Sequence, residues 1–194
     1  GVSFRGRNSG CTIPPADALS PRLLMRRFPL FLMLFALMPM PAHSQGLVWG
    51  VVKKQVRTAF PEVQQMSVDS LAALLATDAE PLLLDIREAD EYAVSHLSGA
   101  QHIDPEASAE VLAGTPKDTP IVAYCSVGYR SSAFADRLRE AGFTNVHNLE
   151  GSIFEWVNSG RPVVRDTTSV EVVHPYNKRW GLLVKRRHRA DLDP

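Results

Sequence analysis

The sequence has almost no cysteine and no net charge. Of its 194 residues only 2 are cysteines, Cys11 and Cys125, and its 21 Lys and Arg residues balance its 21 Asp and Glu residues. The length is enough for one domain with its own core. The histidines and cysteines show no spacing typical of metal ligands, so we expect no metal site.

The chain also has no long apolar run. Residues 28–38 are apolar, but a helix that spans a bilayer needs about 20 such residues. The run follows a short basic start at 25–27 and precedes the small residues Ala42 and Ser44. This pattern predicts a Sec-type signal peptide over 25–44, cut after Ser44, and hence a periplasmic or secreted protein. If the signal were retained, the protein would be anchored to a membrane.

Residues 1–24 show no periodicity, and we expect them to be a non-native or disordered leader. Removal of leader and signal would remove Cys11 and leave Cys125 as a lone cysteine, which cannot form an intramolecular disulfide. A lone thiol in an oxidising compartment needs a reason. The alternative is a buried cysteine that acts as a small apolar side chain.

The rest of the chain alternates predicted strands and helices. Amphipathic spacing predicts a helix over 47–60, within an N-terminal helical extension at 45–64. Such alternation is typical of a parallel α/β sheet, in which ligands bind beyond the C-terminal ends of the strands. The segment 66–76 is predicted to be a short edge strand followed by a helix. Further strands are predicted at 81–86, 100–103, 120–125 and 144–150. Helices are predicted at 87–97, 105–114, 131–142 and 152–160.

Cys125 lies at the end of one of these strands, and the residues after it turn into a helix N-terminus. Backbone N–H groups of such a loop point at its occupant, and the helix dipole adds partial positive charge, so both favour thiolate over thiol. Gly128 allows unusual backbone angles, and Arg130 can face into the loop as a fixed cation. The sequence therefore predicts a small anion cradle around a nucleophilic sulfur.

Three motifs, in order over about Met66–Pro162, resemble the single-domain rhodanese-like sulfurtransferases. Residues 82–100 contain an Asp-x-Arg, Glu-Tyr and His-x-x-Gly-Ala signature, and "YCSVGYRS" is similar to the six-residue active-site loop of that family. Residues 141–156 resemble its closing Gly-Phe, Val, Leu-x-Gly and Trp pattern.

The resemblance implies a rhodanese-like three-layer sandwich at 65–163, followed by a C-terminal basic tail at 164–194. Its central five-stranded sheet would be mostly parallel, with helices on both faces. Two positions depart from the family pattern: Ser98 stands where proline is frequent, and Ser152 where glycine is frequent. Neither departure touches the nucleophile.

The resemblance also implies a mechanism. The Cys125 thiolate would take a sulfane sulfur from thiosulfate or another persulfide donor and pass it to cyanide, a small thiol or a protein thiol partner, without metal or organic cofactor. Arg130 would bind the anionic donor, and we expect Tyr129 to expose its ring at the pocket mouth. The N–H groups of the loop would hold the persulfide; besides Arg130, the loop residues are Ser126, Val127, Gly128, Tyr129 and Ser131.

Other motif residues are expected to be structural. Asp85 and Arg87 would support the site, with Arg87 bridging Glu91 or a backbone carbonyl. We expect His96 to fix a loop by hydrogen bonding and Trp156 to pack in the core.

Two other functions remain open. Phosphatases and arsenate reductases of the same fold have five residues between Cys and Arg, whereas four separate Cys125 from Arg130, and this smaller ring suits a sulfur atom better than phosphate. A persulfide carrier or interaction module would use the same fold with little turnover. Because export is predicted, we expect no nucleic-acid partner.

Charge is unevenly spread along the chain. Residues 45–173 carry 10 basic and 18 acidic side chains, whereas residues 174–194 carry 6 basic and 2 acidic ones. The tail either packs Tyr176, Trp180 and Leu182–Leu183 on the acidic body or contacts anionic lipid headgroups or an acidic partner. We favour packing.

Overall fold

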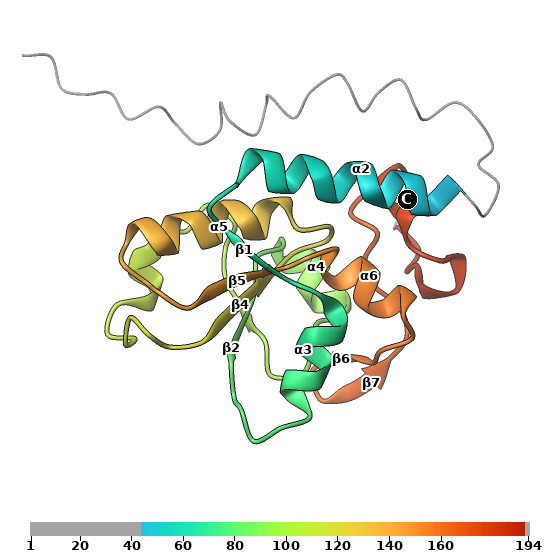
Figure 1. The fold of residues 1–194 in the computed structure, drawn as a ribbon. Helices are drawn as coiled ribbons and strands as arrows, with labels where there is room; N and C mark the ends of the chain where they lie inside the picture. The colour runs from blue at the N-terminus through green and yellow to red at the C-terminus, as the bar shows by residue number, and fades with distance from the viewer. Residues whose placement is uncertain (1–43, 193–194) are drawn as a thin grey trace, which may run out of the picture. The chain divides into compact units, whose positions relative to one another are not determined.

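The computed structural model describes residues 44–192, so Cys11, the predicted leader and the predicted signal before Ser44 lie outside the described residues. Strands and helices alternate along the described chain, as predicted (Figure 1). The elements are α2 (Ser44–Ala59), β1 (Gln64–Met66), α3 (Val68–Leu75), β2 (Leu82–Asp85), α4 (Ala89–Val94), β3 (Gln101–His102), the 3₁₀ turn η2 (Ala109–Leu112), β4 (Ile121–Tyr124), α5 (Tyr129–Glu140), β5 (Val146–Leu149), α6 (Ser152–Asn158), β6 (Val163–Arg165), β7 (Thr168–Val170), and the 3₁₀ turns η3 (Trp180–Leu183) and η4 (Arg186–His188).

The five strands β1 to β5 form one sheet in the order β1-β5-β4-β2-β3, and all neighbouring pairs are parallel. β4 is central: Ile121 lies opposite Leu82 of β2 on one side and Val146 of β5 on the other. Every residue of β4 is buried, as its continuous apolar sequence predicts. The C-terminal ends of these strands therefore share one edge of the sheet, which is where Cys125 lies.

Alternate residues of the strands face opposite layers. Leu83 and Val122 belong to the buried cluster that includes α3 and α6, whereas Leu84 and Ala123 join Phe134 of α5 in the other cluster. Figure 1 shows α2 and α5 on one side of the sheet, and α3 and α6 on the other. The predicted three-layer α/β sandwich is thus confirmed, with a sheet that is parallel throughout.

The helix expected at 47–60 is present as α2. Val52 and Val56 are buried and contribute to the two core clusters, whereas Leu47 and Val51 are exposed. Amphipathic spacing thus directs one face of α2 onto the domain. Within the described residues, no helix combines the length and apolarity needed to cross a bilayer.

Two elements differ from the sequence prediction. The helix expected over 105–114 is only the single 3₁₀ turn η2, because Asp104 accepts hydrogen bonds from the N–H groups of Glu106 and Ala107 and closes a turn instead. The antiparallel hairpin of β6 and β7 was not predicted. Its turn contains Asp166 with a φ of 53°, a backbone angle that Asp tolerates better than most residues.

Candidate active site

The loop that holds Cys125 joins β4 to α5, which begins at Tyr129, two residues earlier than predicted. Gly128 caps this helix with a φ of 108°, and a Cβ there would lie 3.2 Å from Nδ2 of Asn148. A side chain at Gly128 would therefore meet both backbone strain and a close contact. The N–H of Gly128 donates a hydrogen bond to the Sγ of Cys125 at 3.2 Å.

The N-terminus of α6 holds the loop from the other side. Ser152 Oγ accepts a hydrogen bond from the N–H of Cys125 at 3.1 Å and donates one to the Leu149 carbonyl at 3.0 Å. The N–H of Ile153 donates to the carbonyl of Cys125 at 3.2 Å. Ser152, which departs from the expected glycine, thus fixes the backbone of the sulfur-bearing residue itself, so the expectation that this departure does not touch the nucleophile is wrong.

The sulfur of Cys125 lies in a buried site that favours the anion. The residue is 2% exposed. Burial alone would raise the pKa of the thiol, but the charge of Arg130 and hydrogen bonds from Ser131 and Gly128 outweigh it and lower the pKa below its ordinary value. The single hydroxyl proton of Ser131 is donated to Asn148 Oδ1, 2.6 Å away. The hydrogen bond from Ser131 to the Cys125 sulfur therefore comes from its backbone N–H.

Arg130 is paired with a carboxylate to which the sequence prediction gave no role in the loop. Its Nη2 donates to Glu91 Oε1 at 3.0 Å, and its Nη1 lies 2.7 Å from Glu91 Oε2. Ser126 Oγ also donates to Glu91 Oε1, at 2.7 Å. Burial would raise the pKa of Glu91, but Arg130 and Ser126 lower it below its ordinary value. The arginine expected to bind a donor anion therefore already neutralises an internal one.

Asp85 and Arg87 form a fully buried ion pair after β2. Arg87 Nε donates to Oδ1 of Asp85 at 2.8 Å, and Nη2 donates to Oδ2 and to the Ser95 carbonyl, each at 2.6 Å. Arg87 therefore bridges a backbone carbonyl, as expected. The other partner proposed for it, Glu91, forms its close ion pair with Arg130 instead.

Three further side chains were given structural expectations. Trp156 is 6% exposed within the core, and His96 Nδ1 lies 3.2 Å from the carbonyl of Tyr92, so both match their expected roles. The expectation for Tyr129 is wrong: its ring packs edge-on against Phe60, with centroids 5.1 Å apart, because the first turn of α5 faces the α2 layer. Within 44–192, no three His, Cys, Asp or Glu side chains are placed to hold a metal ion.

The C-terminal part of the chain reaches this site. The guanidinium carbon of Arg130 lies 5.0 Å from the centroid of the Tyr176 ring. Of the tail residues expected to pack, Leu183 is buried and Trp180 is half-buried against the core, whereas Leu182 is 49% exposed. Packing is therefore confirmed for part of the tail. Contact with lipid headgroups or an acidic partner stays a prediction.

Comparisons with known proteins agree with this geometry. Residues 67–159 match the model of the rhodanese-like domain family. The thiosulfate sulfurtransferase GlpE of Pseudomonas aeruginosa strain LESB58 is 35% identical over 74 residues, 38% of this chain and 67% of that protein. GlpE of Pseudomonas entomophila strain L48 is 32% identical over 95 residues, 49% of this chain and 85% of that protein. A solved thiosulfate sulfurtransferase from Pseudomonas aeruginosa has a TM-score of 0.53 at 22% identity, over 62% of this chain and 23% of that one, a likeness of fold alone.

Proposed function

The chain belongs to the rhodanese-like family, and from this premise we propose that it is a sulfurtransferase whose nucleophile is Cys125. The Cys125 thiolate attacks the outer sulfur of thiosulfate; a new S–S bond forms, the S–S bond of the donor breaks, and sulfite leaves with the electron pair. Cyanide or a thiolate then attacks the terminal sulfur of the Cys125 persulfide, which returns the thiolate and releases thiocyanate or an organic persulfide. Each step balances in charge without a redox partner.

The observation that carries this proposal is the position of the Cys125 sulfur, buried beyond a central strand beside the N-terminus of α5. Its pKa is below the ordinary value of a thiol, so at a given pH more of it is in the nucleophilic thiolate form than for an ordinary cysteine. The N–H of Gly128, which already donates to Sγ, is oriented to stabilise the anionic persulfide as well. Four residues between Cys125 and Arg130 give a ring suited to sulfur rather than to phosphate.

Arg130 has two tasks in this proposal. Its charge lowers the pKa of Cys125, and it attracts the anionic donor, although Glu91 competes with that donor for the guanidinium. The donor anion therefore binds in part by weakening the contact of Arg130 with Glu91.

A persulfide carrier with little turnover is the second candidate. The observation that favours it is the 2% exposure of Cys125, which limits the access of small acceptors. The carrier would accept and release sulfur only with a partner that opens the site.

The test is the intact mass of the purified protein before and after thiosulfate, followed by cyanide. We expect a gain of one sulfur atom that cyanide removes, and no gain in the Cys125→Ser variant, whose fold is checked by circular dichroism. Sulfur transfer by Cys125→Ser would refute the mechanism. A folded wild-type protein that gains no sulfur from thiosulfate, but gains it from a persulfidated protein, would favour the carrier.

We also propose that the protein is exported, on the basis of the signal pattern at 25–44. If the full chain is expressed in a bacterium with a Sec pathway, the same mass spectrum should show a mature chain that begins at Gln45. A chain that keeps residues 25–44 would overturn this part of the proposal.

A further inference from the structure

Residues 171–190, called here the C-terminal segment, are held against the domain at several points. Ser95 Oγ donates to the Val172 carbonyl at 2.7 Å. Asn158 Nδ2 donates to the Leu183 carbonyl at 2.7 Å, and Asn158 Oδ1 accepts a hydrogen bond from the N–H of Lys185 at 2.8 Å. Within the segment itself, Val173 forms a parallel bridge with Arg189. The segment therefore has a fixed path rather than the free path of a solvated tail.

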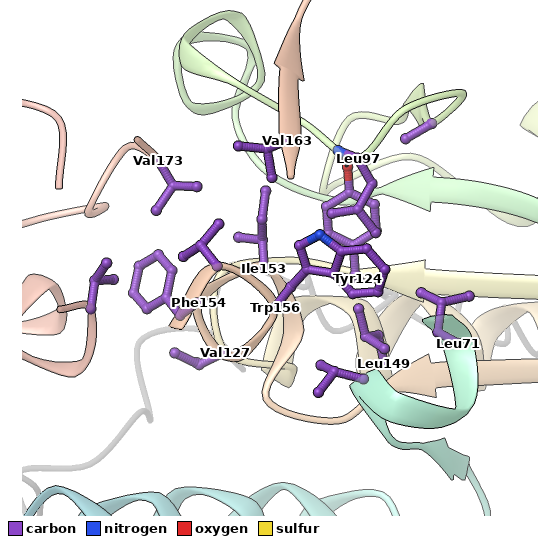
Figure 2. Close-up of a cluster of buried hydrophobic side chains, with 14 of the residues drawn as sticks. Leu71, Leu97, Tyr124, Val127, Leu149, Ile153, Phe154, Trp156, Val163 and Val173 are labelled. Carbon is purple, nitrogen blue, oxygen red and sulfur yellow. Dashed lines mark hydrogen bonds between the residues drawn. The ribbon is translucent and has the colours of Figure 1, made fainter. Parts of the chain in front are cut away.

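The same segment shares the core with the active-site loop. Val173, Leu183 and Val184 are buried in one cluster with Phe154 of α6 and Val127, which lies two residues after the nucleophile. Figure 2 shows Val127, Phe154 and Val173 in this cluster. The packing of the loop thus depends on the C-terminal segment.

Within the segment, Tyr176 has an unusual backbone. Its φ is 63°, in the left-handed region, which is unfavourable for a bulky residue. Neighbouring contacts hold it there: its N–H donates to His174 Nδ1 at 3.1 Å, and Pro175 is so close to Gly181 that a Cβ on that glycine would lie 2.9 Å from the Pro175 ring. Backbone strain of this kind clusters at functional sites.

The side chain of Tyr176 lies against the arginine of the loop. The guanidinium carbon of Arg130 lies over the Tyr176 ring, 5.0 Å from its centroid, and Glu91 forms an ion pair with the same guanidinium. Tyr176 is 43% exposed, whereas the Arg130 side chain is 12% exposed, so the ring is the more exposed member of this contact. Cys125 is 2% exposed, so a donor reaches its sulfur only past the side chains around the loop.

We propose that Tyr176 is a specificity-determining residue of the sulfur-transfer site, which admits small inorganic donors such as thiosulfate and hinders bulky organic persulfides. The inference rests on the proposed function and assigns the donor class of that same site. The ring restricts by size, and its cation–π contact with Arg130 keeps the guanidinium directed at the loop.

The first experiment measures access to the sulfur without any sulfur transfer. Cys125 is labelled with iodoacetamide and with a poly(ethylene glycol) maleimide, and the ratio of the two rates cancels changes in thiolate fraction. We expect Tyr176→Ala to raise the relative rate of the bulky reagent by about tenfold. Tyr176→Phe keeps the ring and should leave the ratio unchanged, as should Lys178→Ala, an exposed position in the same segment. An unchanged ratio in Tyr176→Ala would overturn the inference.

The second experiment compares kcat/KM for thiosulfate and glutathione persulfide, with cyanide as the common acceptor. Wild-type protein and Tyr176→Phe should favour thiosulfate, and Tyr176→Ala should shift the preference toward glutathione persulfide by about tenfold. An active wild-type protein whose preference Tyr176→Ala does not alter would refute the inference but not the proposed function. A wild-type protein inactive with both donors would refute the proposed function, and the labelling ratio would then decide the role of Tyr176 alone.

Discussion

At the residue scale, the proposed chemistry depends on three interacting charges. The guanidinium of Arg130 lowers the pKa of the Cys125 thiol and forms an ion pair with the Glu91 carboxylate. A buried thiolate without a cation would be costly, since burial penalises the charged form. In the proposed mechanism Arg130 is therefore first a group that favours the thiolate of Cys125, and only second a group that binds the donor.

Removal of this cation should raise the pKa of the Cys125 thiol. In Arg130→Ala the burial that raises the pKa remains, while its largest opposing influence is lost. Because the thiolate fraction rises as pH passes the thiol pKa, the pH at which alkylation by iodoacetamide reaches half its maximal rate should rise. The rate at pH 7 should fall accordingly.

Arg139→Ala is the matched control, since Arg139 lies on the same helix and pairs with Asp136 instead of the loop. Its alkylation profile should coincide with that of the wild-type protein. If the profile of Arg130→Ala also coincided with the wild-type profile, the lowered thiol pKa would have to come from the backbone N–H groups alone.

The sequence predicted Cys125 and Arg130 because both belong to one short loop, where spacing along the chain fixes spacing in the fold. Glu91 is 39 residues from Arg130 in sequence, and its place in the Glu-Tyr motif does not tell whether its carboxylate faces solvent. The helix cap supplies the reason: Glu91 Oε2 accepts the N–H of Glu88, which turns the carboxylate back toward the start of α4.

At the element scale, the active-site loop is held by the starts of two helices. α5 begins in the loop itself, and α6 contributes Ser152, whose hydroxyl joins the Cys125 N–H to the Leu149 carbonyl. The sequence predicted both helices from their periodicity. It did not predict these two hydrogen bonds of the Ser152 hydroxyl. In the sequence alone Ser152 is only a departure from the glycine of the family pattern, and its nearness to Cys125 follows from the pairing of β4 with β5.

The order of stability among variants of Ser152 should reverse the usual order for a helix. Ser152→Ala removes the hydroxyl that bonds two backbone groups of the loop and β5, at a cost of about 1–3 kcal/mol, and keeps a side chain at a φ of 51°. Ser152→Gly loses the same hydrogen bonds but relieves the left-handed strain. In urea denaturation the free energy of unfolding should therefore be highest for the wild-type protein, lower for Ser152→Gly and lowest for Ser152→Ala.

Ala133→Gly, in the interior of α5, supplies the comparison. There the backbone is ordinary helix, and glycine should destabilise by about 1 kcal/mol. If alanine at position 152 proved as stable as glycine, the strain assigned to Ser152 would be absent.

At the scale of the whole molecule, the folded unit extends beyond the residues matched by the family model, 67–159. α2 adds Val52 and Val56 to the core from one end of the chain, and the C-terminal segment adds Val173 and Val184 from the other. The sequence predicted α2 from its amphipathic pattern. The C-terminal segment consists of bridges and single 3₁₀ turns, so its apolar residues follow no regular period. The sequence therefore predicted only that the segment packs, and not its path.

This extension predicts that a substitution far in sequence from the Cys125 loop destabilises the whole domain. Val184 is fully buried in the cluster that contains Val127, whereas Leu182, two residues earlier, is 49% exposed. Val184→Asp would bury an unpaired charge and should cost more than about 3 kcal/mol, a large part of a typical domain stability of about 5–15 kcal/mol. Leu182→Asp should cost less than about 1 kcal/mol, as substitutions at exposed positions usually do. Thermal unfolding followed by circular dichroism separates the two, and equal, small decreases in Tm would mean that the C-terminal segment is not part of the core.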